Sequence, residues 1–497
     1  MSTTPSVPGV SPTGSAYSVA STQNNAASIA AQITPQQLWQ RTIDYFEANT
    51  DFWQKFEGGK DRPIMVRTDT SKGEGHTMNI RVGSEFSDEP HYGDESFADE
   101  TDFEKDLLGE YQLKIGLMKH GVSISEFAEE DNGLRGLLAS EHPAKEGRWL
   151  GRQKTDQIDL MLRDETSDTN YMIAGGKTRD TLVAANGLSY NLISTAANFL
   201  GRLGGSKADL GAQASQAMRY MLVTTADAAT VLRQTSEYQN AIQQAAARGK
   251  MNPYFTGEID DLGGISIIDR EVIDMDYDGP LGSPMNPRAT LSTAITAGTT
   301  EFNIVCGAVT SGKKRYTKYF ENYSYKRIGQ TDYSAPSTTR YVLVINPPTA
   351  ATDPNKIGMY SYTVNDGIKL TVAGRLGSAS SGIRATTLGS VTWNTGVWAG
   401  KHTDVHPVGS LVIPCNALGE PIGWSYLLAK AAILRGYGKY RNFLDTSERF
   451  EGNFGRKVYV RSYFGQKIRR DRLGRQPGVL KILHSLHYPD LPLPVVV

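Results

Sequence analysis

The alternation of apolar and polar residues predicts a helix followed by half-buried strands. From residue 36 onward, Trp39, Ile43 and Phe46 recur at helical spacing and would share one face. Two later segments alternate strictly, as strands with one buried face do. Their apolar positions are Met78, Ile80 and Val82 in the first, and Leu113, Ile115 and Leu117 in the second. The stretch KGEG at 72–75 is expected to be a hairpin turn between residues 63–70 and 76–82.

Helical spacing returns in the middle of the chain. A long helix is expected over 143–165, with Leu150, Lys154, Ile158, Met161 and Glu165 along one side. The remaining elements follow from shorter patterns. They are helices over 187–204, 226–249 and 423–441, strands over 218–225 and 265–269, and a last strand over 456–470.

Between residues 280 and 410 the pattern changes to short β runs separated by Thr, Ser, Gly and Pro. The runs are TEFNIVC, TRYVLVINPP, GMYSYTV, IKLTVAG and SVTWNTGVW. This predicts an all-β segment set within a chain that otherwise mixes helices and strands.

Composition adds little that is specific. The 497 residues are 39% hydrophobic and 21% charged, which suits roughly three globular domains of about 150 residues each. A formal net charge of −1 gives no general attraction to nucleic acid or to an anionic membrane. Cys306 and Cys415 are too few for a disulfide framework and are expected to be ordinary core residues. Residues 1–35, rich in Ser, Thr and Pro, are expected to form a flexible arm.

Charge is strongly segregated in two places. A long, polar excursion between the two alternating strands is acidic, and the segment near the C-terminus is basic. The acidic residues are Glu85, Asp88, Glu89, Asp94, Glu95, Asp99, Glu100, Asp102 and Glu104. The basic residues are Arg456, Lys457, Arg461, Lys467, Arg469, Arg470, Arg472 and Arg475.

One stretch has the outline of a phosphate-binding loop. Gly307, Gly312 and Lys313 have the required spacing and follow a predicted strand. However, Lys314 stands where Ser or Thr would bind magnesium, and the residues that follow lack a helical apolar stripe. The stretch is better explained as a hairpin turn.

Other chemical motifs are incomplete. Asp274–Gly279 opens like a calcium loop, but Met285 stands where the bidentate Glu is needed. His402 and His406 flank Asp404 without a third ligand. The sequence offers no nucleophile elbow and no catalytic group of residues.

Three segments resemble the major capsid proteins of tailed bacteriophages, in particular their podovirus-type and gut-phage branch. Residues 61–83 are similar to the rising arm of that family's extended loop. Residues 220–269 match its order of strand, helix, Asn-Pro-aromatic-x-Gly loop and Gly-rich turn. The third segment is 423–441, which leads to the basic strand. The resemblance covers roughly two-thirds of the chain, and the loop near residue 250 is its most specific element.

The resemblance implies an α+β chain with the tailed-phage capsid (Johnson) fold and an inserted β-rich domain. The expected parts are an arm at 1–35, an N-terminal helix at 36–62, an extended β-hairpin loop at 63–125, a peripheral domain with a spine helix at 126–215, an axial domain at 216–275 and 411–450, an insertion at 276–410, and a C-terminal strand and basic tail at 451–497.

The same resemblance implies a structural protein, not an enzyme, with no cofactor or metal. Its copies would form hexamers and pentamers of an icosahedral head around double-stranded DNA, which it would enclose without specific binding. The portal, a separate scaffolding protein and head-decoration proteins are the other candidate partners, and no membrane is implied. Assembly would take place in the cytoplasm of the bacterial host, and the product would be the virion capsid.

Two alternatives remain open at the level of the sequence. One is the shell protein of an encapsulin-type cellular compartment, which has the same fold around a protein cargo. The other is a nucleotide-binding enzyme that uses Gly307 to Lys313.

The two charged segments suggest how neighbouring subunits would meet. The acidic loop of one subunit would lie across the basic segment of the next, and the charges would set the partner and the register. Met78, Ile80 and Leu113 would supply the cohesion by being buried against that neighbour.

Overall fold

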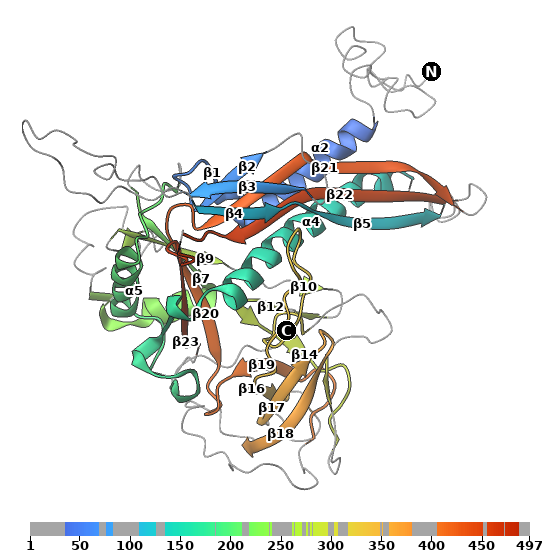
Figure 1. The fold of residues 1–497 in the computed structure, drawn as a ribbon. Helices are drawn as coiled ribbons and strands as arrows, with labels where there is room; N and C mark the ends of the chain where they lie inside the picture. The colour runs from blue at the N-terminus through green and yellow to red at the C-terminus, as the bar shows by residue number, and fades with distance from the viewer. Residues whose placement is uncertain are drawn as a thin grey trace, which may run out of the picture.

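The computed structural model shows an α+β chain in which helices lie against two β-sheets, with a third sheet of similar size below them (Figure 1). It describes residues 35–486 except 69–75, 83–108, 126–134, 184, 211–217, 238, 241–260, 263, 271–274, 277–278, 281, 297–302, 307–316, 348–349, 351–356, 380–404, 451–454 and 472. Among the helices of these residues, none is both long and apolar enough to cross a membrane.

The first sheet is long and has the strand order β1-β2-β21-β22-β5. Its strands are β1 (Glu57–Gly58), β2 (Ile64–Thr68), β21 (Ile433–Phe450), β22 (Gly455–Ile468) and β5 (Gly116–Ser125). The three longest, β21, β22 and β5, are antiparallel, while β2 lies parallel to β21. Because β21 and β22 are far longer than the usual five to six residues, this sheet extends well beyond the rest of the fold.

A separate hairpin consists of β3 (Thr77–Val82) and β4 (Gly109–Lys114), as the alternating segments predict. Met78, Ile80 and Leu113 are buried, and they pack against Met65 and Leu434 of the long sheet. The expected hairpin turn at 72–75 lies outside the described residues. Among the described strands, β2 pairs with β1 and β21, while β3 pairs with β4. The parallel partner β21 comes from the far end of the chain, so local turn chemistry could not indicate it.

Helix α4 (Arg135–Glu165) connects the two parts of the fold. Its 31 residues span about 46 Å, more than the diameter of a small domain. It begins eight residues before the expected start and includes Pro143. Near its middle, α4 crosses α2 (Pro35–Thr50) closely, because a Cβ at Gly147 would lie 2.6 Å from the carbonyl oxygen of Ile43.

The central sheet has the order β6-β23-β20-β7-β9-β8. Its strands are β6 (Tyr171–Ile173), β23 (Val479–Ser485), β20 (Ile422–Leu428), β7 (Tyr220–Thr225), β9 (Ile265–Arg270) and β8 (Asp261–Leu262). The C-terminal half of α4 covers one face, where Ile158 and Met161 join Trp424. Helices α5 (Tyr190–Arg202) and α6 (Ala226–Gln234) cover the other face.

Residues 423–441 are not the predicted helix. They form β20 and the first half of β21, joined by a turn in which Ala431 has a φ of 49°. All seven residues of β20 are buried, since Trp424 and Tyr426 face α4 while Leu427 faces α5 and α6. A strand covered on both faces has no alternation, so its apolar run cannot be distinguished from a buried helix. For the same reason β23, which follows the predicted last strand, was not expected.

The expected β insertion forms a third, fully antiparallel sheet with the order β14-β19-β16-β17-β18-β15. Its strands are β14 (Ala289–Thr290), β19 (Leu411–Cys415), β16 (Arg340–Ile345), β17 (Ile357–Asn365), β18 (Lys369–Ala379) and β15 (Asn303–Val305). Both of its faces carry buried clusters, one of which includes Tyr319 and Phe320. The SVTWNTGVW run lies outside the described residues.

The remaining elements are short. They are the 3-10 helices η2 (Phe52–Phe56), η4 (Asp168–Asn170), η5 (Ala174–Gly176) and η6 (Arg179–Thr181), and the strand pairs β10 (Met275–Asp276) with β11 (Gly279–Pro280) and β12 (Gly282–Ser283) with β13 (Asn286–Pro287). Asp51 begins η2 by accepting a hydrogen bond from the backbone N–H of Trp53.

The β insertion also touches the end of β4, beside the start of β5 of the long sheet, at a point where only glycine fits. Gly329 has a φ of 70°, and a Cβ on it would lie 2.0 Å from the carbonyl oxygen of Lys114. We expect Gly329→Ala to lower the free energy of unfolding by about 2–4 kcal/mol, from the left-handed backbone and the overpacking together. Gly409→Ala is the control, because Gly409 has a φ of 88° but nothing within 4 Å of its Cβ position. If urea denaturation showed the same loss in the free energy of unfolding for both variants, the close contact at Gly329 would be contradicted.

Candidate assembly surfaces and the buried junctions behind them

The acidic loop is anchored by the β3–β4 hairpin. The nine acidic residues from Glu85 to Glu104 lie outside the described residues. The two ends of their segment are placed, because Val82 pairs with Gly109 at the end of the β3–β4 ladder. The loop therefore starts and finishes at one end of a hairpin that is packed on the long sheet.

The basic residues form an extended row along β22. Arg456, Lys457, Arg461 and Lys467 belong to this strand, and Arg469 follows it. At about 3.3 Å per residue, the row from Arg456 to Arg469 is roughly 40 Å long. The basic residues that lie close together in the sequence are thus spread along the length of the sheet.

Several of these basic residues have partners in their own chain. Lys467 donates to the backbone carbonyl of Gln112, at 3.3 Å, and Arg475 pairs with Asp471 at 2.6 Å. Arg470 is exposed and Arg469 partly so. Arg472 lies outside the described residues, as do the side chains of Arg456 and Lys457.

The expected role of Met78, Ile80 and Leu113 in contacts between subunits is not supported. Their exposed fractions are 8%, 8% and 0% in the single chain, so little apolar surface is left for a neighbour. Alternating patterns reveal that a face is buried, but not whether the same chain or another one covers it.

A buried ion cluster fixes the long sheet to the segment around η2. Arg435 on β21 is fully buried and donates to Asp51 at 2.7 Å and to Glu57. Burial alone lowers the pKa of Arg435, but Asp51, Tyr437 and Glu57 outweigh it and raise that pKa well above the ordinary value. The guanidinium therefore stays charged inside the core.

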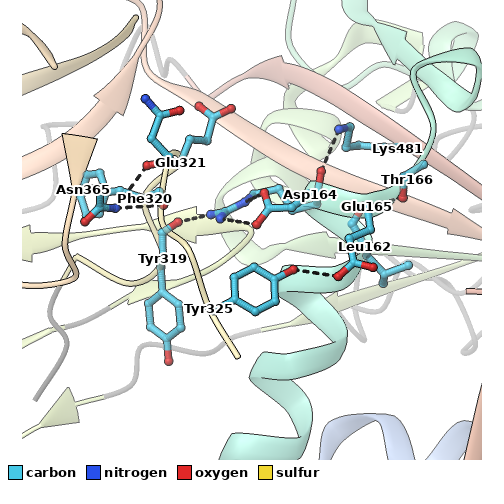
Figure 2. A network of polar contacts seen from close by, with 12 residues as sticks. Leu162, Asp164, Glu165, Thr166, Tyr319, Phe320, Glu321, Tyr325, Asn365 and Lys481 are labelled. Atoms are coloured by element: carbon cyan, nitrogen blue, oxygen red, sulfur yellow. Dashed lines mark hydrogen bonds and ion pairs between the residues drawn. The ribbon is translucent and has the colours of Figure 1, made fainter. Parts of the chain in front are cut away.

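A second polar junction holds the β insertion against the end of α4 (Figure 2). Arg163 of α4 donates to the backbone carbonyl of Tyr319, whose hydroxyl donates to Asp156 at 2.6 Å. Lys318 pairs with the same Asp156 at 2.8 Å. Contacts of this kind position the insertion through the backbone and side chains of residues 317–327.

Glu321 connects this junction to η6 and to β16 of the third sheet. It pairs with Arg179 and, at 3.3 Å, with Arg340. Burial raises the pKa of Glu321, but Arg179 and Arg340 outweigh that effect and lower it to about 2. The carboxylate is therefore ionised throughout the physiological range.

Glu165, the last residue of α4, gives the junction a dependence on pH. It accepts from Tyr325 at 3.1 Å and pairs with Arg327 at 2.6 Å (Figure 2). Burial nevertheless raises its pKa from 4.5 to about 7, against the opposing effect of Arg327. Below pH 4.5 the carboxyl group of Glu165 is protonated in both the folded and the unfolded chain. As pH rises from 4.5 to 7 the unfolded chain ionises first, so the free energy of unfolding falls.

We expect Glu165→Gln to remove this part of the pH dependence. The shift corresponds to at most about 3 kcal/mol between pH 4.5 and pH 7. Urea denaturation on either side of that range would measure it, with the exposed Glu237→Gln as a control for the loss of one carboxylate. If the wild type and Glu165→Gln lose stability equally over that range, Glu165 is not the group responsible.

The cysteine and histidine side chains that could take part in a reaction are buried in the core instead. Burial raises the pKa of the Cys306 thiol to about 12 and that of Cys415 well above its ordinary value, so both remain protonated, and the expectation of core residues is confirmed. Burial also lowers the pKa of His484 to about 4. Within the described part of the chain no group of three His, Cys, Asp or Glu residues is placed to hold a metal ion.

The incomplete motifs can be placed only in part. Gly307 to Lys313 and His402 lie outside the described residues. His406 is buried and hydrogen-bonded to Asn346. Met285, at the position where a calcium loop would need Glu, is a fully buried core residue.

No family model matches the chain, and no curated protein matches it. Among solved structures it is similar to the capsid of Ralstonia phage GP4, at 12% identity and a TM-score of 0.49, over 89% of this chain and 93% of that one. It is also similar to the head of Helicobacter pylori bacteriophage KHP40, at 11% identity and a TM-score of 0.48, over 88% and 92% of the two chains. The capsid of cyanophage Pam1 gives 10% identity and a TM-score of 0.47, over 87% and 92%.

Proposed function

We propose that this chain is a structural protein that assembles into the icosahedral head of a tailed bacteriophage around double-stranded DNA. The observation that carries the proposal is the elongated architecture. The long sheet β5-β22-β21 and the 31-residue α4 lie along one another and reach beyond the central sheet (Figure 1). A subunit of this form has long edges and broad faces, which suits tiling of a surface.

The placement of the charged segments supports assembly through unlike surfaces. A closed shell needs contacts in which one surface of a subunit meets a different surface of the next. The acidic loop starts from one end of the β3–β4 hairpin, whereas the basic row follows β22. The two segments are opposite in charge and belong to different strands of the fold, which is compatible with such a contact.

The β insertion is proposed to lie on the outer surface or at a contact between capsomers. Its sheet has its own buried clusters and is fixed to α4 by the polar junction around Arg163 and Glu321. A domain with its own core can be added to the outside of a fold without changing how the helices and sheets beneath it pack. A particle structure that placed residues 290–400 on the inner wall would refute this placement.

Double-stranded DNA is proposed to be held by confinement, without specific binding. A formal charge of −1 provides no general affinity for phosphates. The portal, a separate scaffolding protein and head-decoration proteins remain the proposed partners, and the bacterial cytoplasm the proposed place of assembly.

Electron microscopy of the purified protein, expressed with its neighbouring genes, tests the function. We expect icosahedral shells that contain DNA when the packaging proteins are present. Shells with a protein cargo and no DNA would instead indicate an encapsulin-type compartment. A chain that stays monomeric and binds a nucleotide at micromolar concentration would support the enzyme alternative.

A further inference from the structure

One loop of the β insertion, residues 323–333 between β15 and β16, has a hairpin-like structure of its own, and we call it the finger. Tyr325 and Tyr333 exchange two backbone hydrogen bonds, at 3.1 and 2.9 Å, and their rings stack with centres 4.9 Å apart. The seven residues between them, 326–332, form the tip of the finger. The paired tyrosines give this loop a defined direction.

The base of the finger is fixed to the third sheet. Asn365, the last residue of β17, donates through Nδ2 to three backbone carbonyls just before the finger, at 2.8, 3.2 and 3.2 Å (Figure 2). They belong to Thr317, Phe320 and Glu321. Asn322 then has a φ of 61°, a left-handed conformation that asparagine tolerates better than most residues. The chain therefore enters the finger from a fixed point.

The middle of the finger lies against the C-terminal half of α4. Gln157 donates to the backbone carbonyl of Lys326 at 3.3 Å. The hydroxyl of Tyr325 donates to Glu165 at 3.1 Å, and Arg327 pairs with the same carboxylate at 2.6 Å (Figure 2). These contacts with α4 determine where the tip is held.

The tip lies where the β3–β4 hairpin joins the long sheet. Lys114 ends β4, and Gly116 begins β5. On either side of Ile115 the chain changes its partner strand, because β4 pairs with β3 whereas β5 pairs with β22. The backbone N–H of Ile115 itself donates to the carbonyl of His76 at 2.9 Å. Residues 114–116 are therefore the joint between the hairpin and the long sheet.

Three glycines bring the finger, β5 and β22 together at this joint. A Cβ on Gly329 of the tip would lie 2.0 Å from the carbonyl oxygen of Lys114, and one on Gly116 would lie 2.3 Å from the backbone nitrogen of Gly329. On the side of β22, a Cβ on Gly465 would lie 2.1 Å from the same carbonyl oxygen of Lys114. The contact is between backbones, which cannot yield by changing rotamer as a long side chain can.

We propose that the finger is a lock, which fixes the direction in which the β3–β4 hairpin projects from the long sheet. Elsewhere the hairpin is held mainly by the buried side chains of Met78, Ile80 and Leu113. Burial of apolar surface is non-directional, so these contacts alone allow the hairpin to tilt. The tip prevents the tilt by filling the space beside residues 114–116. The insertion thereby sets the direction of the acidic loop that the hairpin carries.

This role lies within one subunit and goes beyond the proposed function. The lock can fail its test while the chain still forms shells, and it can pass if the chain forms none.

Distances between two spin labels, measured by electron paramagnetic resonance on the full-length chain, test the lock. One label is placed on the hairpin by Asn79→Cys and the other on β5 by Lys119→Cys, at two exposed positions. Cys306 and Cys415 are buried and should take up no label. An excess of unlabelled chain removes distances between subunits. We expect one narrow distance distribution with the finger intact, and a broad one would overturn the proposal.

Shortening the finger should release the hairpin. Replacing residues 326–332 with Asn-Gly removes the tip and closes the Tyr325–Tyr333 pair with a two-residue turn. The 79–119 distribution should then shift and broaden. A control pair, Asn49→Cys on α2 with Lys119→Cys, does not span the joint and should keep its distribution. An unchanged 79–119 distribution, or equal broadening of both pairs, would overturn the lock.

Gly329→Ala tests the same contact without shortening the finger, and it decides the matter if the shortened chain does not fold. Its Cβ has no space beside Lys114, so the 79–119 distance should shift. Gly409→Ala, with open space at its Cβ position, should leave that distance unchanged. A folded Gly329→Ala variant with the wild-type distribution would show that the tip does not set the direction of the hairpin.

Discussion

Replacing Arg435 with methionine should lower the free energy of unfolding by about 3–5 kcal/mol, because it leaves buried acids without their counter-charge. Arg435 and Asp51 are both 0% exposed, and Glu57 is largely buried beside them. The three residues connect β21 to the segment around η2, so their loss should loosen the long sheet from the helices. Urea denaturation followed by circular dichroism would measure the change.

The matched control is Arg475→Met. Arg475 pairs with Asp471 at 2.6 Å, a geometry as close as that of the buried pair, but its side chain is 62% exposed. The loss should be about 0–1 kcal/mol, since solvent screens an exposed pair and solvates the remaining carboxylate. Should Arg435→Met be as mild as this control, the buried cluster would not be what secures β21.

How well a helix or strand could be predicted from the sequence depended on whether one of its faces is exposed to solvent. β3 and β4 have one buried face, and their alternation revealed them at once. α4 was recognisable from its stripe of apolar residues. β20 is buried on both faces, so its pattern contained no period that separates strand from helix. The parallel pairing of β2 with β21 involves the two ends of the chain and has no local signal.

The buried polar junctions were also not predictable, because they join residues that are far apart in the sequence, as the pairing of β2 with β21 does. Asp51 and Arg435 are 384 residues apart in sequence, and neither stands in a recognisable motif. Lys154 was the one visible sign, since it interrupts the apolar side of the predicted helix between Leu150 and Ile158. A lysine in that position needs a buried partner. The sequence could not indicate that Glu47 and Asn442 would provide it.

Reversing the charge of the acidic loop should stop or misdirect assembly while leaving the subunit folded. Replacing Asp99, Glu100, Asp102 and Glu104 with lysine would set like charges against the basic row of a neighbouring subunit. Exposed ion pairs contribute only about 0–1 kcal/mol each, so their effect is on partner and register more than on cohesion. Light scattering and electron microscopy would measure assembly, and circular dichroism would show that the subunit is folded.

The compensating change is Arg469→Glu with Arg470→Glu, which should partly restore assembly of the loop variant. The structure favours these two positions over Lys467 and Arg475, which already have partners in their own chain. Arg475→Glu combined with the same loop variant is therefore the control and should restore less. Because the rescue needs the two altered surfaces to meet, it distinguishes direct contact from a general effect of net charge. Normal assembly of the loop variant at low and moderate salt would show that another contact organises the shell.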